Sequence, residues 1–196
     1  MDYESEVVKF LSQKENLPFA LEIAEKIVIV KEKLQKDFWK SVEVKLKENL
    51  NSSSFKDAWM IKIDDDVLSS WSGLSIVPIT TPQSLHIFPR IQQWSGDLRL
   101  FYGIRYSREN EEPISIKVLS DFFNELGEEN YKNNPRWIGY KFTDIRPMPN
   151  NFLFKVVDNL DALVEDVINM VWELFEDKVD SINQINEAIA ANNGSP

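Results

Sequence analysis

The 196-residue chain contains no cysteine. Disulfides, thiolate zinc sites, iron–sulfur clusters and thiol catalysis are therefore excluded, and a reducing compartment suits the protein. Histidine is almost as scarce, because the sole histidine, His86, has no second imidazole with which to build a metal site. His86 alternates with Leu85, Ile87 and Phe88 in an expected strand, so we interpret it as a structural residue.

Long apolar runs are also missing from the chain. No stretch approaches the length of about 18 apolar residues that indicates a membrane-spanning helix. The N-terminus, MDYESEVVKF, has neither the basic flank nor the apolar run of a signal peptide. We therefore expect a cytoplasmic protein that does not bind a membrane.

The common catalytic and nucleotide-binding motifs do not occur. The sequence has no G-x-S-x-G, P-loop, G-x-G-x-x-G or H-E-x-x-H pattern. Nucleases of the PD-(D/E)xK type need an acid and a lysine two residues apart on a strand, whereas Glu43 with Lys45 lies in an expected helix, as does Glu176 with Lys178. Side chains two apart on a helix diverge by about 200°. We therefore assign no catalytic residue, expect no cofactor, and favour a protein without enzymatic activity.

Three consecutive acids form the most metal-like feature. Asp64, Asp65 and Asp66 follow the apolar segment WMIKI, and clustered carboxylates at a strand end can hold Mg²⁺. Consecutive strand residues point to alternate faces, however, so an acidic turn explains the run equally well. We expect no metal site and keep these three residues as the alternative.

The hydrophobic spacing predicts a single α+β domain over residues 1–191. After a short first helix, an antiparallel sheet of about five strands is bracketed by two long amphipathic helices, in the order α-α-β-β-β-β-α-β-α. The tail, 192–196, is expected to be disordered. The expected long helices are 18–50 and 158–191, and the sheet region, 58–142, holds strands at 58–63, 73–79, 84–91, 98–106 and 136–142 and a helix at 115–126.

The net charge of −10 is concentrated in the last helix, since residues 151–196 contain nine acids and two bases. In each long helix, charges of one sign recur every seven residues beside the apolar stripe. Such rows flank the seam of paired helices, either within one chain or between two copies; otherwise they are independent solvated faces. The basic row is Lys26, Lys33, Lys40 and Lys47, and the acidic row is Asp166, Glu173, Asp180 and Glu187.

A Trp-x-Gly triplet occurs three times, at or just before expected strands, beginning at Trp71, Trp94 and Trp137. In a structural interpretation, the indole rings cap the sheet core and the glycines permit close backbone approach. In a functional interpretation, the rings line a face for a peptide or an unstacked base, and Arg99 and Arg105 add positive charge. The sequence is compatible with both interpretations.

The order of parts resembles a known family. The segments KEKLQKDFWKSVEVKLKENL, WSGLSIVPI, LRLFYGIRYS and RWIGYKF precede a long final helix. In this respect residues 19–180 resemble the C-terminal half of bacterial proteins of the PD-(D/E)xK nuclease superfamily, found among restriction-like and mobile-element genes. The catalytic residues of those proteins lie in an N-terminal nuclease domain that has no counterpart here. The resemblance therefore implies an accessory, non-catalytic half.

Three functional hypotheses follow. The first is a non-catalytic binding or assembly module of a bacterial or phage protein, accessory to a nuclease or restriction-like system, whose partner is a protein or a second copy. The second is an acidic inhibitor, toxin-neutralising or anti-restriction, that presents the last helix to a basic protein. The third is a divergent metal-dependent nuclease that uses Asp64, Asp65 and Asp66. The overall charge does not itself indicate nucleic acid as a ligand.

Overall fold

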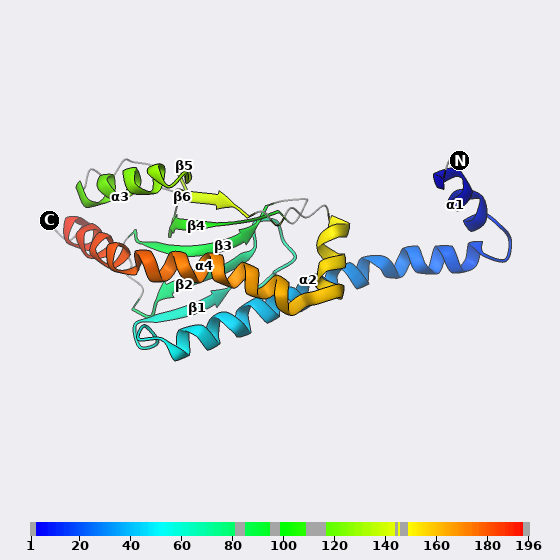
Figure 1. The fold of residues 1–196 in the computed structure, drawn as a ribbon, viewed down its shortest axis with the longest axis horizontal. Helices are drawn as coiled ribbons and strands as arrows, with labels where there is room; N and C mark the ends of the chain where they lie inside the picture. The colour runs from blue at the N-terminus through cyan, green and yellow to red at the C-terminus, as the bar shows by residue number, and fades with distance from the viewer. Residues whose placement is uncertain are drawn as a thin grey trace.

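The computed structural model describes residues 3–80, 85–94, 99–108, 117–143, 145 and 149–193. Over these residues the chain forms an elongated body of sheet and helices, from which an N-terminal helical segment projects (Figure 1). The elements are α1 (Tyr3–Leu11), α2 (Leu17–Ser52), β1 (Trp59–Ile63), β2 (Gly73–Pro78), β3 (Ile87–Gln93), β4 (Leu100–Tyr106), α3 (Lys117–Glu128), β5 (Lys132–Asn134), β6 (Trp137–Phe142) and α4 (Pro149–Asn193).

The described strands form one antiparallel sheet of six strands in the order β1-β2-β3-β4-β6-β5. This confirms the predicted α+β class and its antiparallel sheet. The additional strand is β5, whose sequence, KNN, is polar and exposed throughout. No alternation of apolar and polar residues marks such a strand, so the hydrophobic pattern could not reveal it.

The two faces of the sheet have different surroundings, because successive side chains of a strand point to opposite faces. In β3, Ile87 and Ile91 lie in the hydrophobic core, which the helices complete. Arg90 and Gln92 of the same strand bond to each other on the opposite face. Helix α2 packs against β1, α4 against β3 and β4, and α3 against β6. Among the described residues, no helix covers the second face, which we call the open face.

Helices α2 and α4 bracket the sheet in the sequence, but they lie side by side in the same layer. The ring of Phe38 is 4.9 Å from that of Phe152, and the ring of Phe55 is 5.1 Å from that of Phe175. Phe38 of α2 thus faces the beginning of α4, and Phe55, just after the end of α2, faces a position further along α4, so the two helices run in the same direction (Figure 1). This pairing lies within one chain and involves the C-terminal half of α2, where all its buried residues lie, from Gln35 onward.

The two charge rows do not pair across the helices among the described ion pairs. Lys33 bonds to Asp37 at 2.5 Å, and both Lys40 and Lys47 bond to Glu43, at 2.8 and 2.6 Å. All three contacts are made within α2, because an acid three or four residues away lies closer than the neighbouring helix. The acidic row of α4 is exposed along its whole length.

Helix α4 bends at Asn159, which has non-helical backbone angles (φ −155°, ψ 78°). The side-chain Oδ1 of Asn159 accepts a hydrogen bond from the backbone N–H of Ala162 at 3.1 Å, as an N-cap does. The helix expected over 158–191 thus begins at this cap and is preceded by a further helical segment. It also continues to Asn193, so the first two residues of the expected disordered tail, 192–196, are helical; residues 194–196 lie outside the described residues.

The N-terminal half of α2 projects from the body together with α1 (Figure 1). None of the residues from 3 to 33 is buried. No helix in the described part of the chain is long and apolar enough to cross a membrane.

Candidate binding site on the open face of the sheet

A cluster of aromatic rings covers the open face. Phe101 of β4 is at its centre, with its ring centroid 5.2 Å from that of Trp137 and 5.7 Å from that of Tyr140. Trp137 and Tyr140 are three residues apart in β6, so they would point to opposite faces of a regular strand. An irregularity in the pairing of β6 with β4, at Ile104 and Arg105, adds one residue to β6. This bulge brings both rings to the same face.

Two further indole rings extend the cluster from loops at the strand ends. Trp71 precedes β2 and Trp94 follows β3, and their ring centroids are 4.6 Å apart in an edge-on arrangement. Trp71 is 43% exposed and Trp94 is 39% exposed. By contrast, Trp137 is buried. The cluster thus has a buried base and an accessible rim of two tryptophans.

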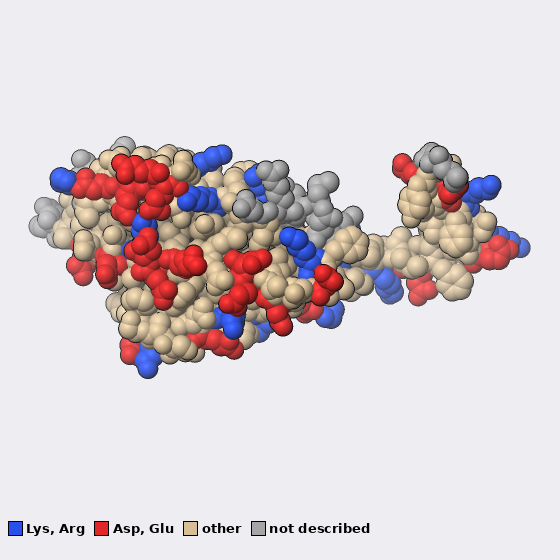
Figure 2. Space-filling model, viewed as in Figure 1, with Lys and Arg blue, Asp and Glu red and all other residues tan. Residues whose placement is uncertain are grey.

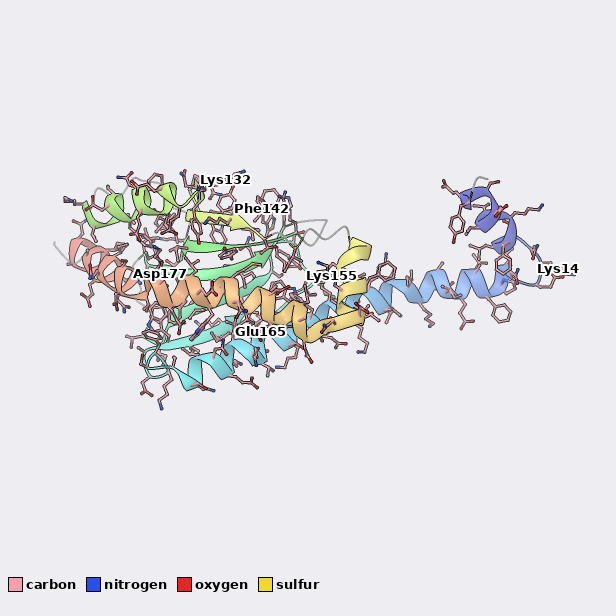
Figure 3. All side chains as sticks on the ribbon, in the orientation of Figure 1. Lys14, Lys132, Phe142, Lys155, Glu165 and Asp177 are labelled. Carbon is pink, nitrogen blue, oxygen red and sulfur yellow. The ribbon has the colours of Figure 1, made fainter. Side chains whose placement is uncertain are left out.

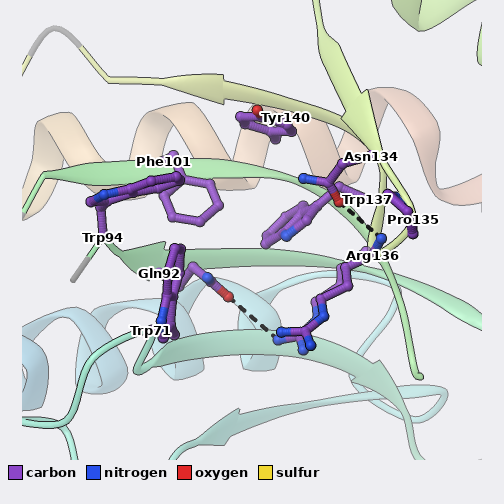
Figure 4. Close-up of a pocket in the computed structure, with 10 residues that line it drawn as sticks. Trp71, Gln92, Trp94, Phe101, Asn134, Pro135, Arg136, Trp137 and Tyr140 are labelled. Carbon is purple, nitrogen blue, oxygen red and sulfur yellow. Dashed lines mark hydrogen bonds between the residues drawn. The ribbon is translucent and has the colours of Figure 1, made fainter. Parts of the chain in front are cut away.

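The aromatic rings and neighbouring polar side chains surround a cavity of about 290 Å³ (Figure 4). Its lining comes from the loops before β2 and after β3, from strands β3, β4, β5 and β6, and from the turn between β5 and β6. The lining residues are Trp71, Gln92, Trp94, Phe101, Arg105, Asn134, Pro135, Arg136, Trp137 and Tyr140.

Arg90 fixes the loop that carries Trp71. Its guanidinium forms an ion pair with Asp64 at 2.5 Å and donates to the backbone carbonyl of Trp71 at 3.1 Å. It also donates to Ser75 Oγ and to Gln92 Oε1, each at 2.8 Å. Because both Nη atoms and Nε are engaged, Arg90 serves to position the loop and leaves ligand contact to its neighbours.

The same loop is also held from the helix layer. The side-chain amide of Gln93 donates to the backbone carbonyls of Val67 and Ser69 at 3.0 and 2.7 Å, and its Oε1 accepts from Gln35 at 2.7 Å. Trp71 itself has a φ of 72°, a left-handed conformation that is uncommon for a residue with a bulky side chain. The surrounding hydrogen bonds hold the loop in this conformation, which presents the indole to the cavity.

The guanidinium of Arg105 contributes a positive charge to the cavity, and among the described residues no carboxylate lines the cavity beside it. This guanidinium donates a long hydrogen bond, 3.4 Å, to Gln92 Oε1. Burial lowers the pKa of Arg105, and the neighbouring charges of Arg90 and Arg136 lower it further. Asp64 is the carboxylate that opposes this lowering of the pKa of Arg105. Asp64 is already paired with Arg90. The cavity therefore carries an excess of positive charge, which favours an anionic ligand.

The structure brings together the residues that the sequence singled out. Trp71, Trp94, Trp137 and Arg105 all line the cavity. Arg99 lies beside it, with its guanidinium carbon 3.8 Å from the ring centre of Phe142, a cation–π distance. Phe142 in turn contacts the central ring of the cluster at 5.5 Å.

Other lining residues were not predicted from the sequence. Gln92 could have been found, because strict alternation in β3 places it beside Arg90 on the open face. Tyr140 requires knowledge of the bulge in β6, and Asn134 and Arg136 belong to the unpredicted strand β5 and its turn. No pattern in the sequence marks these three positions.

The glycines of the Trp-x-Gly triplets have the role that the structural interpretation gives them, which is to permit close approach of the backbone. A side chain at Gly73 would place its Cβ 2.0 Å from the backbone oxygen of Ile91, and one at Gly139 would come within 2.9 Å of the Leu126 side chain. Gly96 lies outside the described residues. The triplets therefore combine close backbone approach at the glycine with ring placement at the tryptophan.

The acidic run is arranged as a turn. Asp64 accepts hydrogen bonds from Arg90 and from the backbone N–H of Gly73, and the carboxylate of Asp66 accepts from the backbone N–H of Leu68. In the described part of the chain, no group of three or more acids, histidines or cysteines is placed to hold a metal ion. The only histidine, His86, is buried, with its ring 5.8 Å from that of Phe88.

No protein-family model, curated protein or solved structure matches this chain.

Proposed function

We propose that the protein is a non-catalytic binding module that holds an unstacked base of single-stranded nucleic acid in the cavity of the open face. The observation that carries this proposal is the pair of half-exposed indole rings, Trp71 and Trp94, beside a cavity with excess positive charge. Aromatic rings on a sheet face stack on bases, and each stacked base contributes about 1–3 kcal/mol. Arg105 and Arg136 are placed to attract the adjacent phosphates.

The size and position of the cavity support a base over other ligands. A volume of about 290 Å³ is near the lower end for small-molecule sites, so it accommodates one planar ring rather than a duplex. Peptides that bind sheets commonly add a strand at an edge. Strands β3 and β4, which underlie the cavity, are paired on both sides, so they offer no such edge.

The resemblance to PD-(D/E)xK proteins supports a role for this module beside a bacterial or phage nuclease. In that setting the module would hold a single strand while a separate domain cuts it. The central step is the binding of the strand, which can be measured on this chain alone.

The test is a fluorescence anisotropy titration with a labelled single strand of about eight nucleotides, within the range that one small domain contacts. Trp71→Ala is expected to weaken binding by about 10-fold or more, since it removes one stacking ring. The matched control is Phe154→Ala, because Phe154 is an aromatic residue that is 70% exposed on α4, outside the cavity. Equal affinities of wild type and Trp71→Ala, or tighter binding of duplex or of peptide, would contradict the proposal.

The acidic surface supports a second candidate, the inhibitor of a basic protein. Acidic side chains gather over α3 and α4 on the face shown in Figure 2, and Figure 3 labels two of them on α4, Glu165 and Asp177. Residues Asp166, Glu173 and Asp180 are exposed on the same helix. A basic partner captured from a host lysate should be lost when these three acids are changed to lysine. A partner that stays bound to the charge-reversed variant would exclude this surface.

A further inference from the structure

Residues 3–33, which we call the arm, comprise α1, the following turn and the N-terminal half of α2. The arm has no buried residue, although much of its sequence is apolar. Thirteen large apolar side chains of the arm are 37% to 79% exposed. They are Tyr3, Val7, Val8, Phe10, Leu11, Leu17, Phe19, Leu21, Ile23, Ile27, Val28, Ile29 and Val30.

This surface is larger than a monomeric protein usually exposes. Thirteen such side chains, distributed around the arm, present together on the order of 1,000 Å² of apolar area, and the largest single patch on a typical monomer is about 300–600 Å². Two copies that buried half of it each would reach about 1,000 Å², the lower limit for a specific interface. The arm alone therefore offers enough area for a dimer.

The apolar stripe of the arm continues an interface that already exists in the molecule. Ile23, Ile27 and Val30 lie on the helical spacing that leads to Phe38, whose ring contacts Phe152 of α4. In the body, α4 covers this stripe. Along the arm, residues 3–33, the stripe has no cover among the described residues.

A second exposed apolar patch lies at the base of the arm. Phe154 and Val157, on the first segment of α4, are 70% and 68% exposed. They belong to the same short helical segment as Phe152, which packs against Phe38. The base of the arm thus presents apolar residues that another copy can cover.

The charges of the arm indicate a second copy as the partner. The arm contains six acids and five bases, a net charge of −1, so the rest of the chain carries −9 of the total −10. Two nearly neutral arms attract each other through apolar burial with little repulsion, whereas an anionic membrane gains no electrostatic attraction. Antiparallel pairing also keeps the two acidic bodies at opposite ends of the dimer.

We infer that the arm is a dimerisation element, in which the arms of two copies pair antiparallel about a two-fold axis near Ile27. Ten residues of helix, about 15 Å, separate Ile27 from Leu17 at the tip and from Asp37 at the base. The tip of each arm therefore reaches the level of Phe38 in the other copy, beside the exposed pair Phe154 and Val157. Each copy uses the same surface, as a two-fold interface requires.

The first test is the mass of the full chain by light scattering across a dilution series. We expect twice the chain mass of 22.8 kDa, and a shift to the single-chain mass on Ile27→Glu. The matched control is Lys26→Gln, which changes the net charge by the same −1 but leaves the apolar side chains of the stripe unchanged. Because all six tryptophans lie outside the arm, the tryptophan bands in the near-ultraviolet circular dichroism of both variants should equal those of the wild type, which would show that the body stays folded.

The second test uses the absence of native cysteine. Ile27→Cys, at the two-fold axis, should form an intermolecular disulfide under mild oxidation, and Phe19→Cys should not. A mixture of the Phe19→Cys and Val157→Cys chains should cross-link to each other. A single-chain mass at every concentration would overturn the inference, as would a dimer that survives Ile27→Glu or a Phe19→Cys disulfide that forms as readily as the one at position 27.

Discussion

At the scale of single residues, Arg105 lies in surroundings that disfavour its positive charge, as we expect for a residue that binds an anionic ligand. It is partly buried, and its pKa is lowered by burial and by the neighbouring cations Arg90 and Arg136. Replacing it with a neutral side chain of similar reach relieves this repulsion. We therefore predict that Arg105→Gln leaves the free energy of unfolding unchanged or raises it by up to about 1 kcal/mol.

The same variant should bind a single strand less tightly and with a weaker dependence on salt, since one phosphate contact is lost. Urea denaturation and anisotropy titrations at two salt concentrations measure the two effects. A variant that is clearly destabilised and binds as well as the wild type would show that Arg105 is a structural residue only.

Lys178 is the buried cation of the helix layer. Its side chain is 5% exposed and contacts Glu125 and Glu129 of α3, at 2.5 and 2.6 Å, and Asp177 at 2.8 Å. Burial opposes its charge, but these hydrogen bonds outweigh burial and raise the pKa of Lys178. Its contribution to stability is therefore fully present below the pKa of an unfolded lysine and is lost only as pH rises through the higher folded value.

We predict that Lys178→Met lowers the free energy of unfolding by about 2 kcal/mol, because three neighbouring carboxylates lose their shared cation. Since those carboxylates are partly exposed and can rehydrate, the loss should stay below that of a fully buried pair. The matched control is Lys117→Met in α3, where the pair with Asp121 is exposed on both sides, and the expected loss is about 0.5 kcal/mol or less. Equal losses for the two variants would contradict this account.

Glu43 is the corresponding buried anion of α2. Its side chain is 10% exposed and accepts hydrogen bonds from Lys40 and Lys47, which lower its pKa. A lowered folded pKa contributes stability above the unfolded value, and this contribution is lost as pH falls through the folded value. Glu43→Gln should therefore cost about 1 kcal/mol at pH 7 and progressively less below about pH 4.5.

Denaturation of wild type and variant at several pH values measures this difference. The control is Glu48→Gln, whose distant pair with Lys45 is 3.8 Å and exposed, so its effect should be small at every pH. A cost of Glu43→Gln that is constant between pH 7 and pH 3 would contradict the assigned role of the carboxylate.

Much of the candidate site could be predicted from the sequence, but not its full composition. Tryptophan is rare and bulky, so its recurrence before strands marked Trp71, Trp94 and Trp137, and alternation placed Arg105 with Arg99. The partners of these residues depend on local irregularities. The bulge in β6 decides that Tyr140 joins the site, and only the three-dimensional fold brings the turn after β5 to the cavity.

At the scale of elements, the close approach of β4 and β6 underlies the cavity. A Cβ at Gly103 would lie 2.0 Å from the backbone oxygen of Gly139, so a side chain there forces the strands apart. We predict that Gly103→Ala destabilises the protein by several kcal/mol and weakens ligand binding. Gly127 is the control, since nothing lies within 4 Å of its Cβ position in helix α3, and Gly127→Ala should stabilise the protein by up to about 1 kcal/mol. Thermal unfolding of the two variants in opposite directions would support this assignment, and equal shifts would contradict it.

The elements that the sequence predicted best are those with strong hydrophobic periodicity. The helix expected over 18–50 is α2, Leu17–Ser52, and the strand expected over 136–142 is β6, Trp137–Phe142. The polar strand β5 has no such signal. The bend at Asn159 is also hidden, because the apolar spacing continues across it and an asparagine cap differs little in sequence from the expected start at Asp158.

The seven-residue charge rows predict the side of a helix on which a charge lies, but not the group with which it pairs. Regular spacing places charges on one side of a helix, but the partner of each charge depends on which opposite charge is nearest. In α2 that charge lies within the same helix, as Lys33 with Asp37 shows. The two long helices do pack together, through apolar side chains rather than through the rows.

At the scale of the whole molecule, three surfaces of different chemistry are separated in space. The arm is apolar and nearly neutral, the layer of α3 and α4 is acidic (Figure 2), and the open face combines tryptophan with arginine. A net charge of −10 would repel nucleic acid from most of the molecule. The proposed strand would therefore approach only at the open face, and its binding should weaken with added salt.

The most direct test of base binding at the open face is a ¹⁵N-indole spectrum of the six tryptophans, recorded during titration with a short single strand. Trp71, Trp94 and Trp137 surround the cavity, whereas Trp39, Trp59 and Trp172 belong to the helix side of the sheet. We predict that the signals of the first three tryptophans shift together and saturate, while those of the second three stay in place. Unchanged signals for Trp71 and Trp94, or shifts confined to Trp172 on the acidic helix, would contradict it.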